Sequence, residues 1–255
     1  MAGRLEGKVI IVLGASDGRS MGAATARRCH EEGAKLVLAA RRLDKVQAIA
    51  DSMGAVAIGC DITDEQQLAA LADAAISHYG KLDGAINFAG IESSSAIADI
   101  SRELLQQSCD VHLIGTALFI KHMTARMVDG GSVVTTSSQT AALAPPGLAA
   151  YAGTKCGADH IVRIAAVEYG AQSIRVNSLS PGFTPSAMTE GFLAMPAIKQ
   201  AFINEIPLGK LPSTDDMANA ALWLLSDESF MTGRILDISG GQTLRRIPTA
   251  TEMGF

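Results

Sequence analysis

Tyr151 and Lys155 are the residues of this 255-residue chain whose types and spacing point most directly to chemistry. Four positions apart on a helix, a phenol and an ammonium lie on the same face. A free tyrosine has a pKa of about 10, and a fixed cation nearby favours the phenolate and lowers that pKa. Such a tyrosine can exchange a proton with a carbonyl or alcohol oxygen. The same spacing also fits a tyrosine in a core contact beside a solvated lysine. The surrounding elements must therefore show whether this pair is catalytic or structural.

Short apolar runs alternate with longer segments of helical periodicity. Val9–Leu13 is apolar at every position, as a strand covered by helices on both faces requires. The predicted strands are Val9–Leu13, Lys35–Ala40, Val56–Gly59, Leu82–Phe88, Ser132–Ser137, Ile174–Leu179 and Arg234–Ile238. The predicted helices are Met21–Glu32, Asp64–Tyr79, Ser101–Met127, Ala149–Tyr169 and Thr214–Ser226. This order predicts an α/β fold in one domain spanning residues 1–255, with a Rossmann-like, doubly wound, parallel seven-stranded sheet.

The stretch at about 183–211 departs from that alternation. It mixes several prolines with large apolar residues such as Met188, Phe192 and Phe202. It is too long for a plain connection and too apolar for a solvated loop. We expect a small helical substrate lid here, and a packing insertion or subunit contact remains the alternative.

Composition excludes several classes of function. With 48% hydrophobic and 18% charged residues, the chain can bury a large core. A formal net charge of −5, without Lys and Arg clusters interleaved with aromatics, argues against a nucleic-acid partner. No apolar segment approaches the roughly 18 residues of a membrane span, and Val9–Leu13 is too short for a signal peptide. Four scattered cysteines suggest neither metal nor disulfides, so we expect a soluble, cytoplasmic protein with reduced thiols.

A glycine-rich loop follows the first predicted strand. It reads Gly14-Ala15-Ser16-Asp17-Gly18-Arg19-Ser20-Met21-Gly22 and leads into a helix. Glycines at this place let backbone amides approach an anionic pyrophosphate at a helix N-terminus. The loop therefore favours dinucleotide binding over a plain tight turn between strand and helix.

Further motifs follow in a fixed order. Asp61 comes after the third predicted strand, Asn87-Phe88-Ala89-Gly90 after the fourth, Ser138 thirteen residues before Tyr151, and Pro181-Gly182 after the sixth. In this order the chain resembles the short-chain dehydrogenase/reductase family, in its main Tyr-x-x-x-Lys branch, over almost its whole length. Near the C-terminus, 206–211, 226–233 and 239–241 resemble the landmarks of that family as well.

The resemblance implies roles for these residues. Ser138 would orient the substrate oxygen, and Lys155 would lower the pKa of Tyr151 and hold the nicotinamide ribose. Tyr151 would donate or accept a proton as hydride moves to or from the cofactor. The resemblance also implies a homotetramer, with residues 101–127 and 149–169 against a neighbour. The candidate cofactor contacts are Gly14, Ser16, Asp17, Gly18, Arg19, Ser20, Met21, Gly22, Arg41, Arg42, Asp61, Ile62, Asn87, Ala89, Gly90, Tyr151, Lys155, Pro181, Gly182, Thr184 and Ser186.

His112 is the fourth catalytic candidate. It stands where most relatives have an asparagine that helps to hold a water linked to the active-site lysine. An imidazole can hold the same water, and its pKa near 6.5 would add a titration in the working range. We therefore expect an inflection in the pH–rate profile within a unit or two of 6.5. A buried histidine satisfied by backbone groups remains the alternative.

The glycine-rich loop is atypical for the main branch. Its third glycine is displaced, and Gly14-x₅-Ser20-Met21-Gly22 resembles the loop of enoyl reductases. In those enzymes six residues separate the tyrosine and lysine, against three here, so the spacing favours carbonyl and alcohol chemistry. Enoyl-thioester reduction remains an alternative. A non-catalytic dinucleotide-binding sensor or partner subunit is a second one.

Cofactor preference depends on the end of the second strand. Ala40 stands where an NAD enzyme usually has an acidic residue, and Arg41 and Arg42 follow it. Two guanidinium groups can grip a 2′-phosphate, which favours NADP(H) over NAD(H). Asp17 weakens this preference, and Arg41 stacked on adenine remains the alternative. The sequence thus predicts an NADP(H)-preferring oxidoreductase for a small apolar secondary alcohol and its ketone.

Overall fold

The chain folds around one parallel sheet. The computed structural model describes residues 3–254, and its seven strands run in the order β3-β2-β1-β4-β5-β6-β7, all parallel. The strands are β1 (Val9–Leu13), β2 (Lys35–Ala40), β3 (Val56–Gly59), β4 (Gly84–Asn87), β5 (Gly131–Thr136), β6 (Ile174–Pro181) and β7 (Ile235–Ile238). All seven predicted strands are confirmed, three of them with their exact limits. The predicted Rossmann-like fold class is therefore confirmed.

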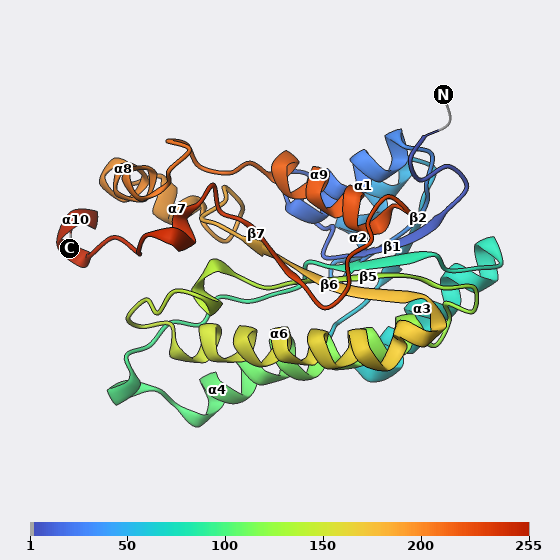
Figure 1. The fold of residues 1–255 in the computed structure, drawn as a ribbon, viewed down its shortest axis with the longest axis horizontal. Coiled ribbons are helices and arrows are strands. Elements are labelled where there is room, and N and C mark those ends of the chain that lie inside the picture. Colours follow the sequence, from blue (N-terminus) through green and yellow to red (C-terminus); the bar gives the residue numbers. More distant parts are fainter. Residues whose placement is uncertain (1–2, 255) are drawn as a thin grey trace.

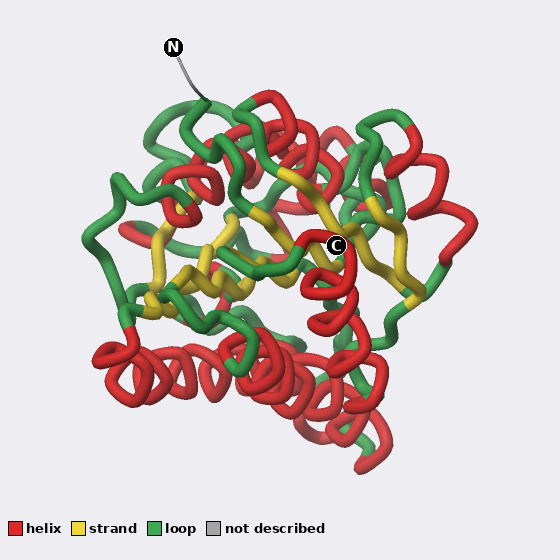
Figure 2. The backbone as a smooth tube through the Cα atoms, turned by 90° about the vertical axis from the view of Figure 1, so that its right-hand side faces the viewer, coloured by secondary structure: helices red, strands yellow, loops and turns green. Residues whose placement is uncertain are grey.

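Helices cover both faces of the sheet (Figures 1 and 2). On one face lie α1 (Met21–Glu31), α2 (Leu43–Asp51) and α9 (Thr214–Leu225), which pack on one apolar cluster that includes Leu38 and Val134. On the other lie α3 (Glu65–Tyr79), α5 (Gly115–Thr124) and α6 (Ala149–Tyr169), around a cluster that includes Val133 and Phe119. Because both faces are covered, every residue of β1 is buried, which explains its uninterrupted apolar run.

Two helical predictions need correction. The single helix expected at Ser101–Met127 is wrong: α4 (Arg102–Ser108) passes into a π-helical turn, η2 (Cys109–Ile114), before α5 begins. Apolar periodicity alone does not show such a turn, because it inserts one extra residue without ending the helix. Helix α2 was not predicted, since Arg42 at its start gives no side-chain cap.

The carboxyl ends of the strands carry the remaining short helices. Residues 183–211, the lid segment, contain α7 (Glu190–Leu193) and α8 (Pro196–Glu205). A C-terminal helix, α10 (Ala250–Met253), packs on α8 although about 50 residues separate them. Figure 1 shows these three helices together at the left, beyond the ends of β6 and β7.

The sheet order reverses between β1 and β4. After β3 the chain returns to the middle and adds β4 on the other side of β1, with Leu13 opposite Asn87. In open α/β sheets ligands bind in the crevice beyond such a switch point, at the carboxyl ends of the strands. Gly14 and Phe88, the first residues after these two strands, therefore mark where a cofactor site should form.

Candidate active site

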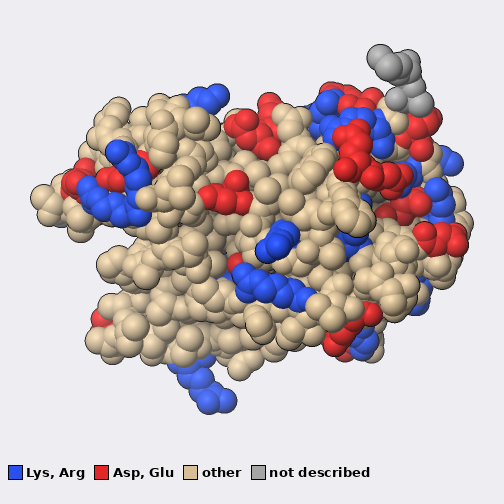
Figure 3. Space-filling view, in the orientation of Figure 1, with Lys and Arg blue, Asp and Glu red and all other residues tan. Residues whose placement is uncertain are grey.

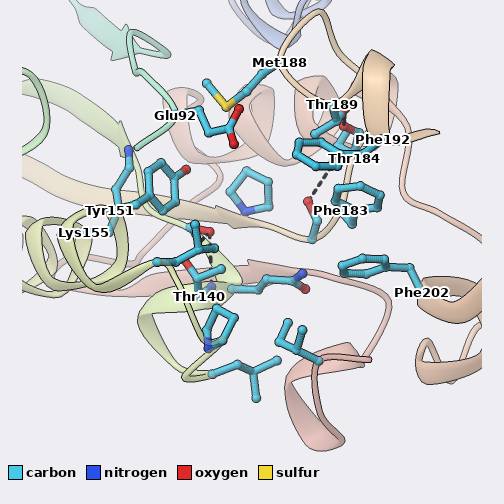
Figure 4. Close-up of a pocket in the computed structure, with 18 of the residues that line it drawn as sticks. Glu92, Thr140, Tyr151, Lys155, Phe183, Thr184, Met188, Thr189, Phe192 and Phe202 are labelled. Carbon is cyan, nitrogen blue, oxygen red and sulfur yellow. Dashed lines mark hydrogen bonds between the residues drawn. The ribbon is translucent and has the colours of Figure 1, made fainter. Parts of the chain in front are cut away.

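A large, mostly apolar cavity opens at this edge of the sheet. Its volume is about 830 Å³, and its floor contains Ser138, Tyr151 and Lys155. In the space-filling view the molecule is notched on its left side, and the walls of the notch are largely uncharged (Figure 3). The close-up in Figure 4 shows Tyr151 and Lys155 on one side and Phe183, Phe192 and Phe202 on the other. The structure thus brings the sequence-predicted catalytic pair into one cavity with the lid segment.

Lys155 lies under the cavity on α6, with 4% of its surface exposed. Its Nζ donates a hydrogen bond to the Thr136 carbonyl at the end of β5, at 2.6 Å. Burial lowers the pKa of Lys155 to about 8, and the charge of Asp159, one turn further along α6, opposes that shift. An ammonium with one fixed partner keeps two N–H donors, which fits a group that holds ribose hydroxyls.

Tyr151 differs from the sequence prediction in its electrostatics. Burial raises its pKa, the Glu92 carboxylate raises it further, and the Ser138 hydroxyl acts in the opposite direction. The expected lowering by Lys155 is wrong here, because burial, the largest cause, moves the pKa of Tyr151 upward. Lys155 Nζ is bonded to Thr136 and lies 5.8 Å from the centre of the phenol ring. At neutral pH the phenol is therefore protonated, the form that can donate a proton to a carbonyl oxygen.

Ser138 follows β5 and faces the same cavity. Its Oγ accepts hydrogen bonds from the Thr140 backbone N–H at 3.2 Å and from Thr140 Oγ1 at 2.9 Å. These contacts use the acceptor positions of the hydroxyl and leave its own O–H free to donate. Ser138 thus shapes the loop and still offers a donor to a substrate oxygen.

His112 is held by protein groups at both ring nitrogens. Its Nε2 accepts a hydrogen bond from the Ile91 N–H at 3.1 Å, which places the proton on Nδ1, 3.1 Å from Thr154 Oγ1. The ring meets Tyr151 edge to face, with 5.1 Å between ring centres. The π-helical turn carries His112, whose side chain is 1% exposed. The imidazole therefore buttresses the tyrosine and ties the loop after β4 to α6.

The expected titration of His112 is wrong. Burial lowers the pKa of His112 to about 3, and the charge of Lys155 lowers it as well. Because both nitrogens already have protein partners, the geometry matches the backbone-satisfied alternative rather than a water-holding relay. An inflection near 6.5 in the pH–rate profile is no longer expected from this residue.

The glycine-rich loop packs tightly except at its tip. Gly14 has φ +99°, and a Cβ there would meet the Phe88 backbone at 2.8 Å, while a Cβ on Gly22 would meet the Gly14 carbonyl at 2.5 Å. Around Gly18, by contrast, a Cβ would meet nothing within 4 Å. The protein therefore needs Gly14 and Gly22 for its own packing, and the backbone at Gly18 stays open to a ligand.

The start of α1 completes the loop. Ser20 caps the helix by accepting a hydrogen bond from the Ala23 N–H, and Asp17 Oδ1 accepts one from the Arg19 N–H. The Arg19 guanidinium reaches Glu190 on α7 at 3.0 Å, so it links this loop to the lid segment. The other N–H groups of the first turn are the kind that bind a phosphate.

The predicted cofactor contacts downstream lie at the same edge. Asn87 Oδ1 accepts a hydrogen bond from the Ala89 N–H at 2.8 Å and so shapes the loop before Gly90. Gly182 lies against Ser239, which a Cβ would approach to 2.8 Å. The residues of the predicted set that line the cavity are Met21, Ala89, Gly90, Tyr151, Lys155, Pro181, Gly182, Thr184 and Ser186.

The predicted adenine end lies in a second, polar cleft of about 580 Å³. Arg41 and Asp61 line it together with Arg102 at the start of α4, whereas Ile62 is buried in the core below. Arg42 turns away and donates from Nη2 to Ser16 Oγ at 3.0 Å. The two arginines that were predicted as a pair therefore face different surroundings. Together, the loop, Lys155 and this cleft fit a dinucleotide from nicotinamide to adenine.

Besides the loop from Gln139 to Leu148, sequence reasoning missed two parts of the cavity wall. One is the C-terminal tail, which contributes Arg245, Arg246, Ile247, Pro248, Thr249, Ala250 and Met253. A signal was present, because Thr249 and Glu252 form a capping box that starts α10. The other is Glu92, two residues after the predicted Asn87–Gly90 motif, and no pattern in the sequence singled it out.

Comparison with known proteins decides the family. A family profile described as enoyl-(acyl carrier protein) reductase matches residues 14–243. The 2,5-dichloro-2,5-cyclohexadiene-1,4-diol dehydrogenase of Sphingobium indicum is 34% identical over 247 residues, which cover 94% of this chain and 98% of the relative. A solved short-chain type dehydrogenase/reductase from Mycobacterium ulcerans has a TM-score of 0.92 at 30% identity and covers 98% of this chain and 94% of its own. This chain belongs to the short-chain dehydrogenase/reductase family.

A further solved member of the short-chain dehydrogenase/reductase family is similar over nearly the whole chain. It is a 7α-hydroxysteroid dehydrogenase in complex with NADH and 7-oxo glycochenodeoxycholic acid, with a TM-score of 0.88 at 32% identity and coverage of 93% and 95%. The family membership makes the chain an oxidoreductase, which argues against the alternative of a non-catalytic sensor.

The described residues also bear on metals and membranes. Between residues 3 and 254, no group of three or more His, Cys, Asp or Glu side chains is placed to hold a metal ion. Within the same range, no helix combines the length and the apolar character needed to span a bilayer.

Proposed function

We propose that this chain is an NADP(H)-preferring alcohol dehydrogenase or carbonyl reductase that interconverts an apolar secondary alcohol and its ketone. One observation carries the proposal: a proton donor, Tyr151, and a hydroxyl donor, Ser138, line the same apolar cavity above the buried ammonium of Lys155. A ketone oxygen placed between the two hydroxyls would meet both donors. Polarisation and protonation of that oxygen would then occur together.

The roles follow from the contacts of each side chain. Lys155 would hold the ribose, and the open backbone at Gly18 with the start of α1 would hold the pyrophosphate. The nicotinamide, when bound, supplies the hydride for reduction and accepts it in oxidation. Ser138 donates to the substrate oxygen, and Tyr151 gives its proton to that oxygen as the carbonyl carbon gains hydride. Alcohol oxidation runs the same steps backwards, with Tyr151 receiving the proton.

The direction of the pKa shift gives the pH dependence. Because burial raises the pKa of Tyr151, the protonated form extends further above neutral pH than in a free tyrosine. Reduction, which needs the phenol, should fall only at alkaline pH, and oxidation, which needs the phenolate, should increase as the pH rises.

The substrate class is supported by the cavity wall. Phe183 stacks on Phe202 with 4.0 Å between ring centres, Phe192 is drawn next to Phe183, and Met188 lies nearer to Glu92 (Figure 4). Aromatic rings and a flexible thioether favour a compact apolar ring system over a charged substrate. The names of the relatives point the same way: one acts on a chlorinated cyclohexadiene diol, and another was solved with a 7-oxo steroid conjugate. We therefore extend the proposal to cyclic alcohols and ketones.

The substitution Tyr151→Phe tests the function directly. It removes the proton but keeps the ring, so ketone reduction should fall by at least about a hundredfold while cofactor affinity stays near the parent value. Tyr169→Phe, which removes the same hydroxyl at the far end of α6, is the matched control and should be fully active. Cofactor fluorescence titration and initial rates measure the two quantities, and a loss of only a few-fold would remove Tyr151 from its assigned role.

The preference for NADP(H) rests on Arg41 in the polar cleft, with Arg102 across from it. The substitution Arg41→Asp should shift the ratio of kcat/KM from NADPH toward NADH, because it replaces a phosphate partner with a carboxylate that repels phosphate. Arg42→Asp is the comparison, since Arg42 contacts Ser16 instead. An equal loss with both cofactors in Arg41→Asp would mean that the residue has only a structural role.

Enoyl-thioester reduction is the second candidate, favoured by the Gly14-x₅-Ser20 loop and by the description of the matching family profile. Against it stands the spacing of Tyr151 and Lys155 on consecutive turns of α6. Assays of NADPH and NADH oxidation with crotonyl-CoA and with cyclohexanone separate the two. Turnover of the enoyl thioester alone would replace the alcohol proposal.

A homotetramer is the proposed assembly. Ile164 and Val167 on α6 are 47% and 84% exposed, and Leu105 on α4 is 40% exposed, which leaves apolar surface on the two predicted contact helices. Light scattering should give four times the chain mass, and Val167→Glu should reduce it. A monomer at working concentration would refute the assembly.

A further inference from the structure

Four ionisable side chains besides Tyr151 line the substrate cavity: Glu92, Lys155, Arg245 and Arg246. Three of them have protein partners. Lys155 is bonded to Thr136, Arg245 Nη1 donates to the Asn204 carbonyl at 2.7 Å, and Arg246 pairs with two carboxylates at 2.7 and 2.8 Å. Among the described residues, Glu92 has neither a hydrogen bond nor an ion pair through its carboxylate. It is the one charged group of this wall left for a ligand.

The backbone on both sides of Glu92 is fixed. The Ile91 N–H is bonded to His112 Nε2, and Ser93, 2% exposed, accepts a hydrogen bond from Ser108 Oγ at 2.8 Å. These contacts hold the main chain on both sides of Glu92, whose own side chain is exposed. Figure 4 shows the Glu92 carboxylate directed into the cavity, between Tyr151 and Phe192. The electrostatic effect of Glu92 on Tyr151 agrees with this placement.

We propose that Glu92 is a specificity-determining residue, whose carboxylate accepts a hydrogen bond from a second hydroxyl or amino group of the substrate. This inference rests on the proposed function, because it concerns a group on the substrate other than the reacting alcohol. A carboxylate accepts hydrogen bonds and donates none, so it selects donors. A substrate carboxylate placed beside Glu92 would also be disfavoured by like-charge repulsion, although Lys155, Arg245 and Arg246 line the same cavity.

A cavity that accepts only hydrocarbon rings would leave Glu92 without any partner once water is displaced. Glu92 is exposed in this structure, and a bound ring that covered it without supplying a donor would leave its charge unpaired, which is unfavourable. A substrate that supplies a donor removes that cost. The same reasoning applies to sites built around a polar group, which reject analogues that lack the matching donor. Cyclic diols and amino alcohols therefore fit this wall better than the corresponding simple alcohols.

The test compares cyclohexanol with the 1,2-, 1,3- and 1,4-cyclohexanediols. In the parent enzyme at least one diol should have a kcat/KM about tenfold above that of cyclohexanol, the effect of one hydrogen bond to a charged acceptor. Glu92→Ala should lose this tenfold ratio, which is compared within each enzyme because removing the charge also shifts the pKa of Tyr151. Glu92→Gln, which keeps an acceptor without the charge, should retain part of the ratio. It should also gain about tenfold in activity with 4-hydroxycyclohexanecarboxylate.

A spectroscopic titration checks the placement without turnover. The groups facing the Tyr151 ring are Glu92 from the loop after β4, His112 from η2, Lys155 from α6 and Ser138 from the loop after β5. Removing the Glu92 charge should lower the pKa of Tyr151, because that charge disfavours the phenolate. Tyrosinate absorbance of Glu92→Gln against the parent, each corrected with its Tyr151→Phe counterpart, measures this shift.

The outcomes are distinct. Turnover of cyclohexanol with the diol ratio unchanged in Glu92→Ala overturns the role of Glu92 and leaves the proposed function standing. No oxidation of any alcohol by the parent overturns both. A tyrosinate titration that does not move in Glu92→Gln contradicts the position of the carboxylate beside Tyr151. The inference is supported if Glu92→Ala loses the diol-to-cyclohexanol ratio of kcat/KM and Glu92→Gln shows a lower pKa for Tyr151.

Discussion

The floor of the cavity and its lid are built in opposite ways. In the floor, Lys155 and His112 are 4% and 1% exposed, and both are fixed by backbone groups. In the lid, Met188 and Phe192 are 42% and 41% exposed, and the chain segments around them are held by surface ion pairs such as Arg246 with Glu205. Buried hydrogen bonds fix geometry, whereas exposed ion pairs contribute little rigidity.

This difference matches what each region has to do. Proton transfer requires reacting atoms within hydrogen-bond distance, so the floor tolerates little displacement. Substrate fit in an apolar lid depends on shape and volume, which methionine and aromatic side chains adjust at low cost. We therefore expect substitutions in the floor to change kcat by orders of magnitude, and substitutions in the lid to change mainly KM.

The largest effect is expected for Lys155→Met. Turnover should fall by at least about a hundredfold and cofactor affinity should weaken, because the ammonium that holds the ribose is lost. Folding should not suffer, since a buried cation is itself destabilising. Initial rates, cofactor titration and a melting curve at pH 7 measure this, with the exposed Lys121→Met as control.

The pH dependence of stability sharpens the same prediction. Burial lowers the pKa of Lys155 from 10.5 to about 8, so between these values the unfolded chain binds more protons than the folded one. The parent should therefore gain stability from Lys155 as the pH rises from about 8 to 10.5, and Lys155→Met should lack that gain. If the free energy of unfolding of both proteins changed in parallel over this pH range, the lowered pKa of Lys155 would be contradicted.

The sequence was sufficient for the regular part of the molecule. Uninterrupted apolar runs predicted the strands because a sheet covered on both faces needs them, and the spacing of Tyr151 and Lys155 placed both side chains on one face of α6. It was not sufficient for His112, since the π-helical turn that directs the ring inward leaves no apolar signature. The wall formed by residues 245–253 depends on contact with α8, and a tertiary contact of that kind has no local pattern.

An intermediate effect is expected for His112, which belongs to the floor but does not exchange protons. His112→Ala leaves the Ile91 N–H without its acceptor, so stability should fall by about 1–3 kcal/mol and turnover several-fold as the Tyr151 ring loses its support. His112→Asn, which keeps polar atoms at this place, should recover part of both losses.

The pH–rate profile distinguishes a buttress from a proton relay. With its pKa lowered to about 3, His112 stays neutral throughout the working range. The parent and His112→Asn should therefore share the same profile between pH 5.5 and 8. An inflection near 6.5 that is present in the parent and absent from the variant would restore the relay.

The smallest effect is expected for Arg246 in the lid. Arg246 joins Glu205 on α8 to Glu252 on α10; the side chains of Arg246 and Glu252 are 49% and 44% exposed, and that of Glu205 is 12% exposed. Arg246→Ala should raise KM a few-fold for a bulky ring substrate such as a steroid ketone, because the C-terminal wall is less well held, and should leave kcat within about twofold. High salt should have a similar effect on the parent and little on the variant, since salt screens exposed pairs. Arg126→Ala, which breaks an exposed pair with Asp73 away from the cavity, is the control. A change in kcat larger than that in KM would mean that the lid and the floor are coupled, and that the division between them does not hold.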